Sequence, residues 1–227
     1  MTSDVACEPV LRFDQLVCEP ARGLRRIVAS GEVPEGGALV LRGPSGAGKS
    51  TLLRALARLV PIVSGRVWLA GRDMGEFSPP LWRRLVHYLA QRPVVFDGSA
   101  LDNVLVPYRL RIFKDLPPPG RDRVVEAMTR LGLSDPAQDA RTLSGGELAR
   151  VALLRAVFAG PSVLLLDEPT AALDADTRRT VIQFLGRWVK ARPGRGLVLV
   201  SHVEEDGGAF SPVTAVDLHR NGTEAAP

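Results

Sequence analysis

The sequence predicts an α/β fold whose core is a mostly parallel sheet. Three short apolar runs carry this prediction: Ala38–Leu41, Val163–Leu166 and Leu197–Val200. Uninterrupted apolar runs of this length are typical of parallel strands that are buried on both faces. The first run leads through a glycine-rich loop into Ser50–Val60, where leucines recur at helical spacing. A strand, a loop and a helix in this order fit such a fold.

The remaining elements follow along the chain. Additional strands are predicted at Val10–Val17, within Arg22–Val33 and at Ser64–Gly71. Helices are predicted at Leu81–Tyr88, in part of Asp97–Ile112, and at Arg121–Leu131, Leu148–Phe158 and Asp176–Ala191. Three consecutive prolines make Asp115–Gly120 a loop. Residues 1–227 are expected to form a single domain, with a flexible tail at 221–227.

Composition limits the classes of function. Apolar residues make up 45% of the chain, which is enough for a sizeable core. The 29 basic and 25 acidic residues are interspersed, so no nucleic-acid-binding stripe is predicted. The two cysteines, Cys7 and Cys18, predict no disulfide framework. The N-terminus is polar and no run of about 18 apolar residues occurs, so we expect neither a signal peptide nor a membrane span. Any link to a membrane is expected to go through a partner.

The segment Gly43–Ser50, GPSGAGKS, matches the phosphate-loop pattern G-x-x-x-x-G-K-[ST] at every fixed position. In this pattern backbone N–H groups form a nest for phosphate oxygens, and the following helix adds its positive N-terminal dipole. Lys49 is expected to reach the β- and γ-phosphates, and Ser50 to bind Mg²⁺. An ordinary glycine-rich turn is the alternative, but the flanking strand and helix favour the phosphate loop. The residues expected to contact the nucleotide here are Gly43, Pro44, Ser45, Gly46, Ala47, Gly48, Lys49, Ser50 and Thr51.

Two acidic residues follow the apolar run Val163–Leu166. Asp167, at the end of this strand, is expected to hold Mg²⁺ directly or through water. Glu168 is one residue further along, where it could orient and deprotonate the attacking water. Most apolar runs that end in Asp-Glu are ordinary strand ends. The complete phosphate loop upstream favours the functional interpretation.

The segment Leu143–Glu147, LSGGE, is a second candidate for phosphate contact. Ser144 can cap the helix that begins near Glu147, and Gly145 and Gly146 let a phosphate approach the backbone. A capped helix start without function is the alternative. Together with the phosphate loop and the strand ending in Asp-Glu, this segment resembles the signature loop of the ATP-binding-cassette (ABC) ATPases. The resemblance extends from about residue 10 to 219.

Three more residues match motifs of this family in the expected order. Gln91 matches the Q-loop glutamine, which the resemblance places near Mg²⁺, the water and the membrane partner. Asp174, in Ala172–Asp174, resembles the D-loop residue. His202 matches the switch histidine that contacts the γ-phosphate. Taken alone, Gln91 would more often be a surface residue, and His202 a structural one.

The resemblance implies a mechanism and an architecture. The fold class is then a P-loop NTPase (RecA-like) core with an N-terminal antiparallel β subdomain and a helical subdomain at about 83–155. Two copies of the chain would pair head to tail with ATP and Mg²⁺, so that Ser144–Gly146 of one covers the nucleotide of the other. A multi-pass transmembrane permease subunit would be driven at the cytoplasmic face of the inner membrane. Two alternatives stay open: a soluble ABC ATPase in DNA repair or translation, and a cassette that does not hydrolyse ATP.

Within the family, residues 86–108 resemble the FetA/YbbL type, a bacterial ATPase proposed to act in iron export. Two departures from the usual pattern stand out. Glu147 replaces the usual glutamine of the signature loop. No aromatic residue occurs between Phe13 and Trp68, although many members stack the adenine on one, here expected around Cys18–Pro20. Weak discrimination between ATP and GTP is therefore expected, unless Arg22, Arg25 or Arg26 supplies the platform.

Overall fold

The computed structural model describes residues 8–19, 26–201 and 204–219. Its centre is a five-stranded, all-parallel sheet in the order β6-β7-β8-β3-β9. The strands are β3 (Ala38–Arg42), β6 (Val86–Leu89), β7 (Val163–Asp167), β8 (Gly196–Val200) and β9 (Val213–Asp217). The predicted α/β class and the three strands that supported it are confirmed.

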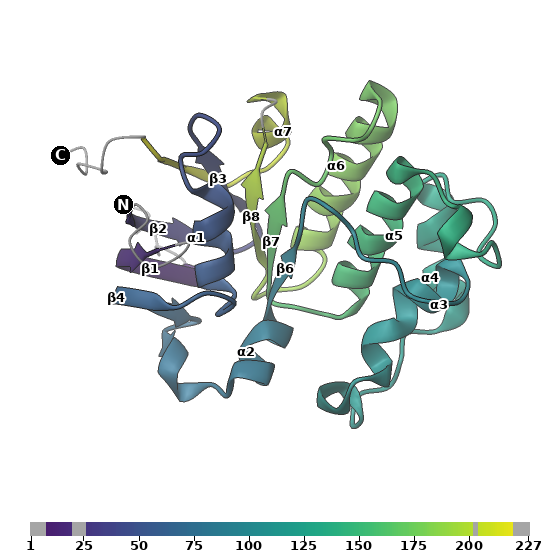
Figure 1. Ribbon diagram of the computed structural model, residues 1–227, viewed down its shortest axis with the longest axis horizontal. Helices are drawn as coiled ribbons and strands as arrows, with labels where there is room; N and C mark the ends of the chain where they lie inside the picture. Colours follow the sequence, from purple (N-terminus) through teal and green to yellow (C-terminus); the bar gives the residue numbers. More distant parts are fainter. Residues whose placement is uncertain (1–7, 20–25, 202–203, 220–227) are drawn as a thin grey trace, which may run out of the picture.

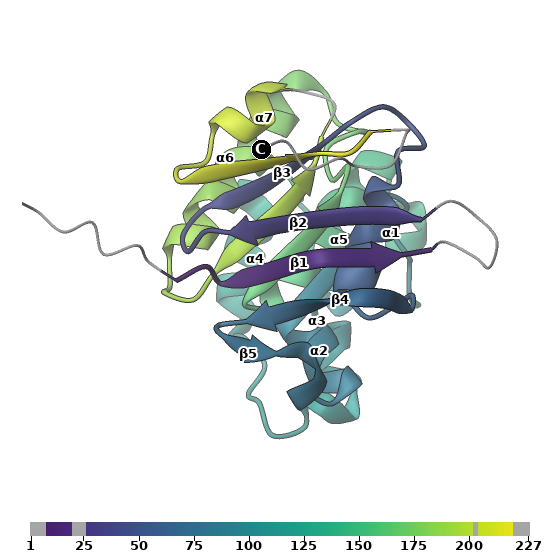
Figure 2. The same cartoon turned by 90° about the vertical axis from the view of Figure 1, so that its left-hand side faces the viewer.

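A second, antiparallel sheet of four strands lies beside the first in the order β2-β1-β4-β5 (Figure 2). Its strands are β1 (Leu11–Cys18), β2 (Ile27–Val33), β4 (Ile62–Leu69) and β5 (Arg72–Asp73). In β1, Leu11, Phe13 and Leu16 are buried while Arg12 and Asp14 are exposed. This alternation is expected of a sheet with one solvated face.

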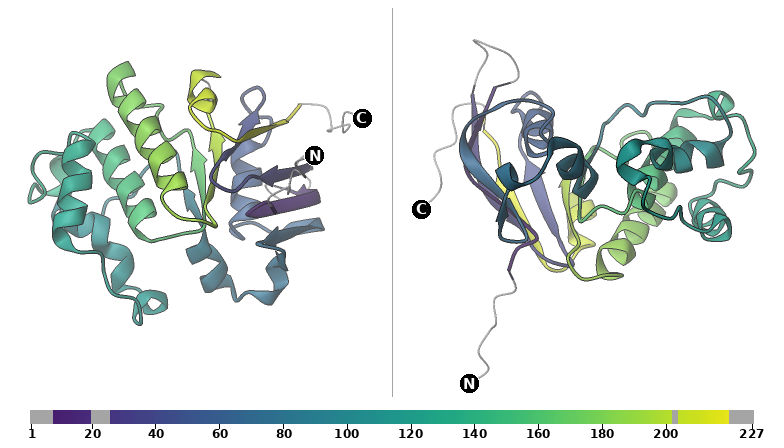
Figure 3. Two further views of the ribbon diagram at one scale, coloured as in Figure 1. Left: turned by 180° about the vertical axis from the view of Figure 1, so that it is seen from behind. Right: turned by 90° about the horizontal axis from the view of Figure 1, so that it is seen from below.

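The helices cover both faces of the parallel sheet (Figure 1). Helix α1 lies between the two sheets, and α5 and α6 lie on the opposite side of the parallel sheet. The helix bounds are α1 (Lys49–Leu56), α2 (Pro79–Leu85), α3 (Ala100–Leu105), α4 (Arg121–Arg130), α5 (Gly145–Phe158), α6 (Ala175–Lys190) and α7 (Glu204–Gly208). Figure 3 shows that α3 and α4 lie at the end of the molecule away from the antiparallel sheet.

Two hydrophobic clusters hold these layers together. On β7, Val163 and Leu165 join the cluster that contains α1 and the antiparallel sheet, whereas Leu164 and Leu166 join the cluster that contains α5 and α6. Because successive side chains of a strand point to opposite faces, one apolar strand can fill both clusters. The three central strands β7, β8 and β3 are therefore buried on both faces, whereas the edge strand β9 is largely exposed.

The helix predicted at Leu81–Tyr88 is only partly correct. Helix α2 ends at Leu85, and Val86–Leu89 forms β6, which pairs with β7. Leucine and tryptophan recur here at helical spacing, so the periodicity does not indicate strand β6. Pairing of β6 with the buried strand β7 is a tertiary interaction, and it overrides the local periodicity. Strands β5 and β9 and helix α7 are not predicted from the sequence.

Candidate active site

The phosphate loop joins β3 to α1 and has the backbone that its glycines permit. Gly48 immediately precedes α1 with φ of 100°, and a Cβ there would lie 2.4 Å from Ile27 Cδ1. Lys49 begins the helix, is 7% exposed, and donates hydrogen bonds from Nζ to the carbonyls of Gly43 (2.6 Å) and Pro44 (3.1 Å). Its ammonium group is thus held within the loop that would cradle the phosphates.

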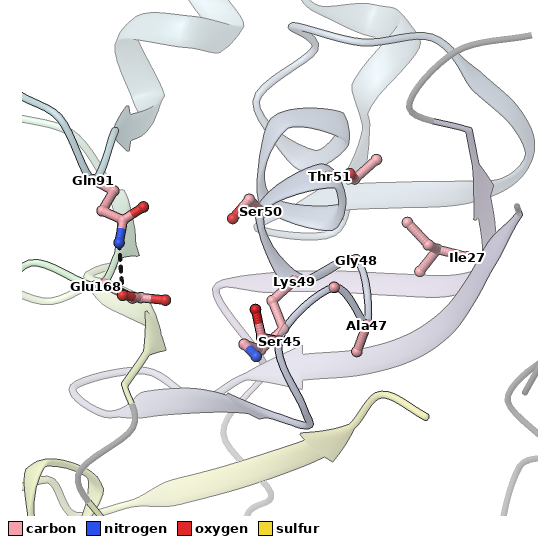
Figure 4. Close-up of a pocket in the computed structure, with 10 residues that line it drawn as sticks. Ile27, Ser45, Ala47, Gly48, Lys49, Ser50, Thr51, Gln91 and Glu168 are labelled. Carbon is pink, nitrogen blue, oxygen red and sulfur yellow. Dashed lines mark hydrogen bonds between the residues drawn. The ribbon is translucent and has the colours of Figure 1, made fainter. Parts of the chain in front are cut away.

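A cavity of about 500 Å³ opens above this loop (Figure 4). Gln91 and Glu168 lie across it from Ser45 and Ser50, and Ile27 lies on the opposite side from Gln91 and Glu168. The residues that line the cavity are Ile27, Ser45, Gly46, Ala47, Gly48, Lys49, Ser50, Thr51, Gln91 and Glu168. It therefore brings together the phosphate loop and two residues predicted from distant segments of the chain.

The predicted metal ligands meet at the edge of the cavity. Ser50 Oγ donates to Asp167 Oδ1 at 3.0 Å, and Tyr88 donates its hydroxyl to Asp167 Oδ2 at 2.8 Å. A hydroxyl and one carboxylate suit Mg²⁺, which is held by few protein oxygens and takes others from phosphate and water. Among the described residues no three His, Cys, Asp or Glu side chains form a metal-binding group. This donor set thus fits a metal that is bound together with a nucleotide.

Glu168 and Gln91 form the opposite wall. Gln91 Nε2 donates to Glu168 Oε2 at 2.8 Å. Glu168 has φ of 51°, and its N–H donates to the carbonyl of Val200 at 3.1 Å. A residue other than glycine in this left-handed region is strained and persists only where its surroundings hold it. The backbone at Glu168 therefore aims the carboxylate into the cavity at some conformational cost.

The signature segment begins α5, as predicted, with Ser144 as its N-cap. The Glu147 N–H donates to Ser144 Oγ, and the Ser144 N–H donates to Glu147 Oε2 at 2.8 Å, which completes a capping box. The hydrogen bond from the Ser144 side chain lowers the pKa of Glu147. Gly146 lies against Leu173, since a Cβ there would be 3.4 Å from Leu173 Cδ2.

Neither Ser144–Gly146 nor Asp174 lines the cavity of its own chain. Asp174 caps α6 by accepting hydrogen bonds from the N–H groups of Asp176 (3.1 Å) and Thr177 (3.0 Å). His202 falls outside the described residues, as do the tail at 221–227 and Arg22 and Arg25. The site in one chain is thus assembled from the phosphate loop, Gln91, Asp167 and Glu168.

The region of the missing aromatic residue is partly described. Cys18 is fully buried at the end of β1, and burial raises the pKa of its thiol to about 11. Arg26 donates from Nε to Glu19 Oε1 at 2.5 Å. Ile27, at the start of β2, is the aliphatic side chain on this side of the cavity.

Two features of the site were missed by the sequence analysis. Tyr88 was assigned to a helix, so its place beside Asp167 could not be foreseen. Asp206 is 4% exposed and accepts hydrogen bonds at Oδ2 from Thr170 Oγ1 (3.2 Å) and Ser201 Oγ (2.7 Å). The periodicity of neither segment indicates these contacts, because each depends on how distant loops are placed.

Comparison of this chain with known proteins identifies a matching family and several similar proteins. The profile of the family described as "ABC transporter" matches residues 28–171. The chain is 36% identical over 185 residues to "Phosphonates import ATP-binding protein PhnC 2" of Synechococcus sp., covering 77% of this chain and 68% of that one. It is 32% identical over 189 residues to "Probable iron export ATP-binding protein FetA" of Escherichia coli, covering 82% of each.

Solved structures give the same fold. The ATP-binding cassette MJ0796, in a dimeric post-hydrolysis state with ADP and Pi, superimposes with a TM-score of 0.76 at 23% identity, over 92% of this chain and 96% of that one. A bacterial Atm1-family ABC exporter with ATP bound superimposes with a TM-score of 0.78 at 25% identity, over 94% of this chain and 38% of the exporter chain.

Proposed function

Because this chain belongs to the ABC transporter family, we propose that it is the motor subunit of a membrane transporter that exports iron or another metal ion. As a member of that family it is an ATPase that uses ATP with Mg²⁺. The observation that carries the catalytic part of the proposal is the cavity wall formed by Glu168 and Gln91. It stands across from the phosphate loop, where the terminal phosphate of a bound nucleotide would lie.

We assign binding of the triphosphate to the loop and Lys49. Backbone N–H groups of the nest and the start of α1 meet the phosphate charge. The Lys49 ammonium is held inside the loop by the carbonyls of Gly43 and Pro44, where it would meet phosphate oxygens. Ser50 and Asp167, with Gln91 at the rim, are the side chains that would hold Mg²⁺, which supplies charge neutralisation between the phosphates when bound. Thr51 completes the lining on the helix side.

Glu168 is assigned as the general base. Its carboxylate accepts a hydrogen bond from Gln91, so it is oriented across the cavity and can take a proton from a water aligned with the terminal phosphate. His202 is assigned to stabilise the charge that develops on that phosphate. Hydrolysis then forms a bond between the water oxygen and the terminal phosphorus and breaks the bond from that phosphorus to the oxygen bridging the β-phosphate, so that ADP keeps the bridging oxygen and inorganic phosphate is released.

The site is completed by a second copy of the chain. Ser144 and Gly145 are exposed, and a Cβ at Gly145 would meet no atom within 4 Å, so this surface is open to a ligand from outside. Together with Asp174 they are proposed to cover the nucleotide of a partner copy in a head-to-tail homodimer. The dimer of the MJ0796 cassette supports such pairing. Opening and closing of the dimer would drive the permease.

A multi-pass permease subunit is the proposed membrane partner, docked on the helical subdomain at about 83–155. Val94 is 62% exposed and Phe96 is 42% exposed, and both follow Gln91 closely in the chain. The described residues contain no candidate membrane-spanning helix. The position that we propose is peripheral, at the cytoplasmic face of the inner membrane, and is reached through that permease.

The cargo is the finer part of the proposal. FetA supports metal export, whereas PhnC 2 is named for phosphonate import, so the test must separate these two. The chain is to be co-purified from membranes with a candidate multi-pass permease and reconstituted in vesicles. Fe²⁺ should stimulate ATP hydrolysis and leave the cytoplasmic side, whereas a simple alkylphosphonate should do neither. A Glu168→Gln complex serves as the control. Failure to recover any membrane partner would favour the soluble alternative.

A further inference from the structure

Asp206 is a buried carboxylate beside the loops that follow β7 and β8, and no step of the proposed function uses it. Asp206 is on α7 and is 4% exposed. Both of its described hydrogen bonds go to one oxygen, Oδ2, which accepts from Thr170 Oγ1 at 3.2 Å and from Ser201 Oγ at 2.7 Å. Removing a carboxylate from water is costly unless such donors compensate. The burial of the Asp206 carboxylate therefore calls for a structural or functional explanation.

The two donors belong to the two segments that carry the proposed catalytic groups. Thr170 is two residues after Glu168, in the turn where the Ala171 N–H donates to the carbonyl of Glu168 at 3.2 Å. Ser201 follows β8 and directly precedes His202 in the chain. One carboxylate oxygen thus ties the segment after the general base to the segment that leads into the switch histidine.

Asp206 is itself anchored to the core. Gly207, the next residue, is buried, and a Cβ there would lie 3.1 Å from Val40 Cγ2 on β3. Phe210 is 3% exposed and packs in the cluster on the α5 and α6 side of the parallel sheet. Because α7 is seated against the sheet, Asp206 can act as a fixed point for two loops that leave the carboxyl edge.

The backbone of Glu168 requires such a fixed point. Its φ of 51° is strained for a residue with a side chain, and surrounding contacts must hold it. One contact is the hydrogen bond from its N–H to the carbonyl of Val200, the residue before Ser201. The Thr170–Asp206–Ser201 bridge repeats this link between the same two segments.

We propose that Asp206 is a positioning residue for hydrolysis. It acts through Thr170 and Ser201 to hold the segment after Glu168 in register with the end of β8, the strand that precedes His202 in the chain. Asp206 does not line the cavity, so its removal should affect turnover and leave nucleotide binding to the phosphate loop. This inference rests on the proposed roles of Glu168 and His202.

The test compares variants of the full chain by kcat and KM for ATP, the Kd of a fluorescent nucleotide, and Tm. Asp206→Ala removes the acceptor, and we expect kcat to fall by roughly 10-fold to 100-fold, as small displacements of reacting groups do, with Kd within about twofold of wild type. Asp206→Asn keeps an amide oxygen in place of Oδ2 and should restore most of kcat. Asp122→Ala, at an exposed carboxylate on α4, is the matched control and should leave kcat unchanged.

A second set of variants removes the hydroxyl groups of Thr170 and Ser201, which donate the hydrogen bonds to Asp206. Thr170→Val and Ser201→Ala should each lower kcat in the wild-type background and have little further effect in Asp206→Ala, because residues that act as one unit are not additive. These two variants also carry the test if Asp206→Ala does not fold. A wild-type kcat in Asp206→Ala, or fully additive effects, would overturn the inference. Loss of kcat in Asp206→Asn equal to that in Asp206→Ala would overturn it as well.

The outcome can be separated from failure of the proposed function. If Glu168→Gln keeps wild-type turnover, the assignment of the general base fails. If Glu168→Gln is inactive and Asp206→Ala turns over normally, only the role of Asp206 fails. A fall in Tm with unchanged kcat for the folded fraction would show a purely structural residue and would also overturn the inference.

Discussion

Tyr88 donates its hydroxyl to Asp167 Oδ2 at 2.8 Å, while Ser50 donates to Oδ1 of the same carboxylate at 3.0 Å. The two oxygens of the proposed metal ligand are therefore fixed by two different elements, β6 and α1. Arg54 adds a longer hydrogen bond, from its Nε to the Tyr88 hydroxyl at 3.4 Å. Burial, together with the hydrogen bond to Asp167 and the charge of that carboxylate, raises the pKa of Tyr88 against the lowering effect of Arg54, so the hydroxyl stays a donor. Partners of this kind orient the ligands of a metal.

Tyr88→Phe should weaken the contribution of Mg²⁺ to nucleotide binding. The change removes one hydroxyl and keeps the ring, so the fold should be preserved while Asp167 loses its second donor. Loss of an outer partner typically costs about 10-fold to 100-fold in metal affinity or activity. We expect the Mg²⁺ concentration for half-maximal enhancement of fluorescent ATP binding to rise about 10-fold, with metal-free nucleotide binding unchanged. Tyr108→Phe, whose hydroxyl donates to the carbonyl of Phe158, is the matched control and should leave the Mg²⁺ titration unaltered.

Glu168→Gln should bind ATP but lose most turnover. The amide is nearly the same size as the carboxylate and can still meet Gln91, yet it cannot accept a proton from water. Loss of a general base lowers the rate by roughly 100-fold to 10,000-fold. Gel filtration with ATP should show a dimer that persists, and phosphate release should be close to background. Lys49→Ala should differ by losing nucleotide affinity, because its ammonium group sits in the phosphate loop itself.

The sequence predicted what depends on local pattern. The phosphate loop, the capped start of α5 and the buried strands β3, β7 and β8 each have a signal within a few residues. Tyr88 and Asp206 were missed because their roles arise from pairing between β6 and β7 and from the meeting of two loops with α7. Pairings between distant segments leave no period in the sequence, and Tyr88 lies where helical spacing continued past the true end of α2.

His87, on β6, should make the protein less stable in mild acid. Burial lowers its pKa to about 4 from an ordinary value of 6.5, and the nearby charge of Arg155 acts in the same direction. The unfolded chain therefore takes up the proton first as pH falls. The contribution of neutral His87 to the free energy of unfolding is fully present above about pH 6.5 and is lost progressively toward pH 4. The loss is at most about 3 kcal/mol, since one pKa unit is worth about 1.4 kcal/mol. His87→Gln should lose less stability than wild type between pH 7 and 4.5 in urea titrations. Parallel curves for the two proteins would contradict this.

Charge on the segment after Gln91 should uncouple transport from hydrolysis. Val95 is partly buried against the core, so a charge there would also destabilise the fold, and Val94 is the better site. Phe96 lies under the Arg155 guanidinium, 4.8 Å from its ring centroid, and Arg155 also donates to the carbonyl of Val94 at 2.9 Å. This segment is thus joined directly to α5, the helix that begins at the signature loop.

Val94→Asp should therefore lower co-purification with the permease and transport by about 10-fold or more, while ATP hydrolysis by the isolated chain is preserved. The physical reason is that a carboxylate introduced into an apolar interface would be removed from water without a partner, which is costly. Val63→Asp, at a 48% exposed valine on β4, is the control for charge alone. Equal transport by Val94→Asp and Val63→Asp would argue against docking at this segment.

Discrimination between ATP and GTP should be weak, because the side of the cavity away from Glu168 presents Ile27 and not an aromatic ring. The nest and Lys49 would contact the phosphates and not the base, and none of the described residues that line the cavity offers an aromatic ring for base stacking, which is worth roughly 1–3 kcal/mol. We expect Kd values for the two nucleotides within about threefold of each other in competition titrations.

Cys18→Tyr is unsuitable for adding a ring, since Cys18 is fully buried and a larger side chain would overpack the core. Glu19→Tyr is the suitable variant and should increase affinity for ATP by up to about 10-fold, while Glu19→Ala, which also breaks the contact with Arg26, should not. Arg26 is the described alternative platform, through its planar guanidinium. A strong preference for ATP in the wild type that disappears in Arg26→Ala would refute weak discrimination and identify that arginine as the stacking partner.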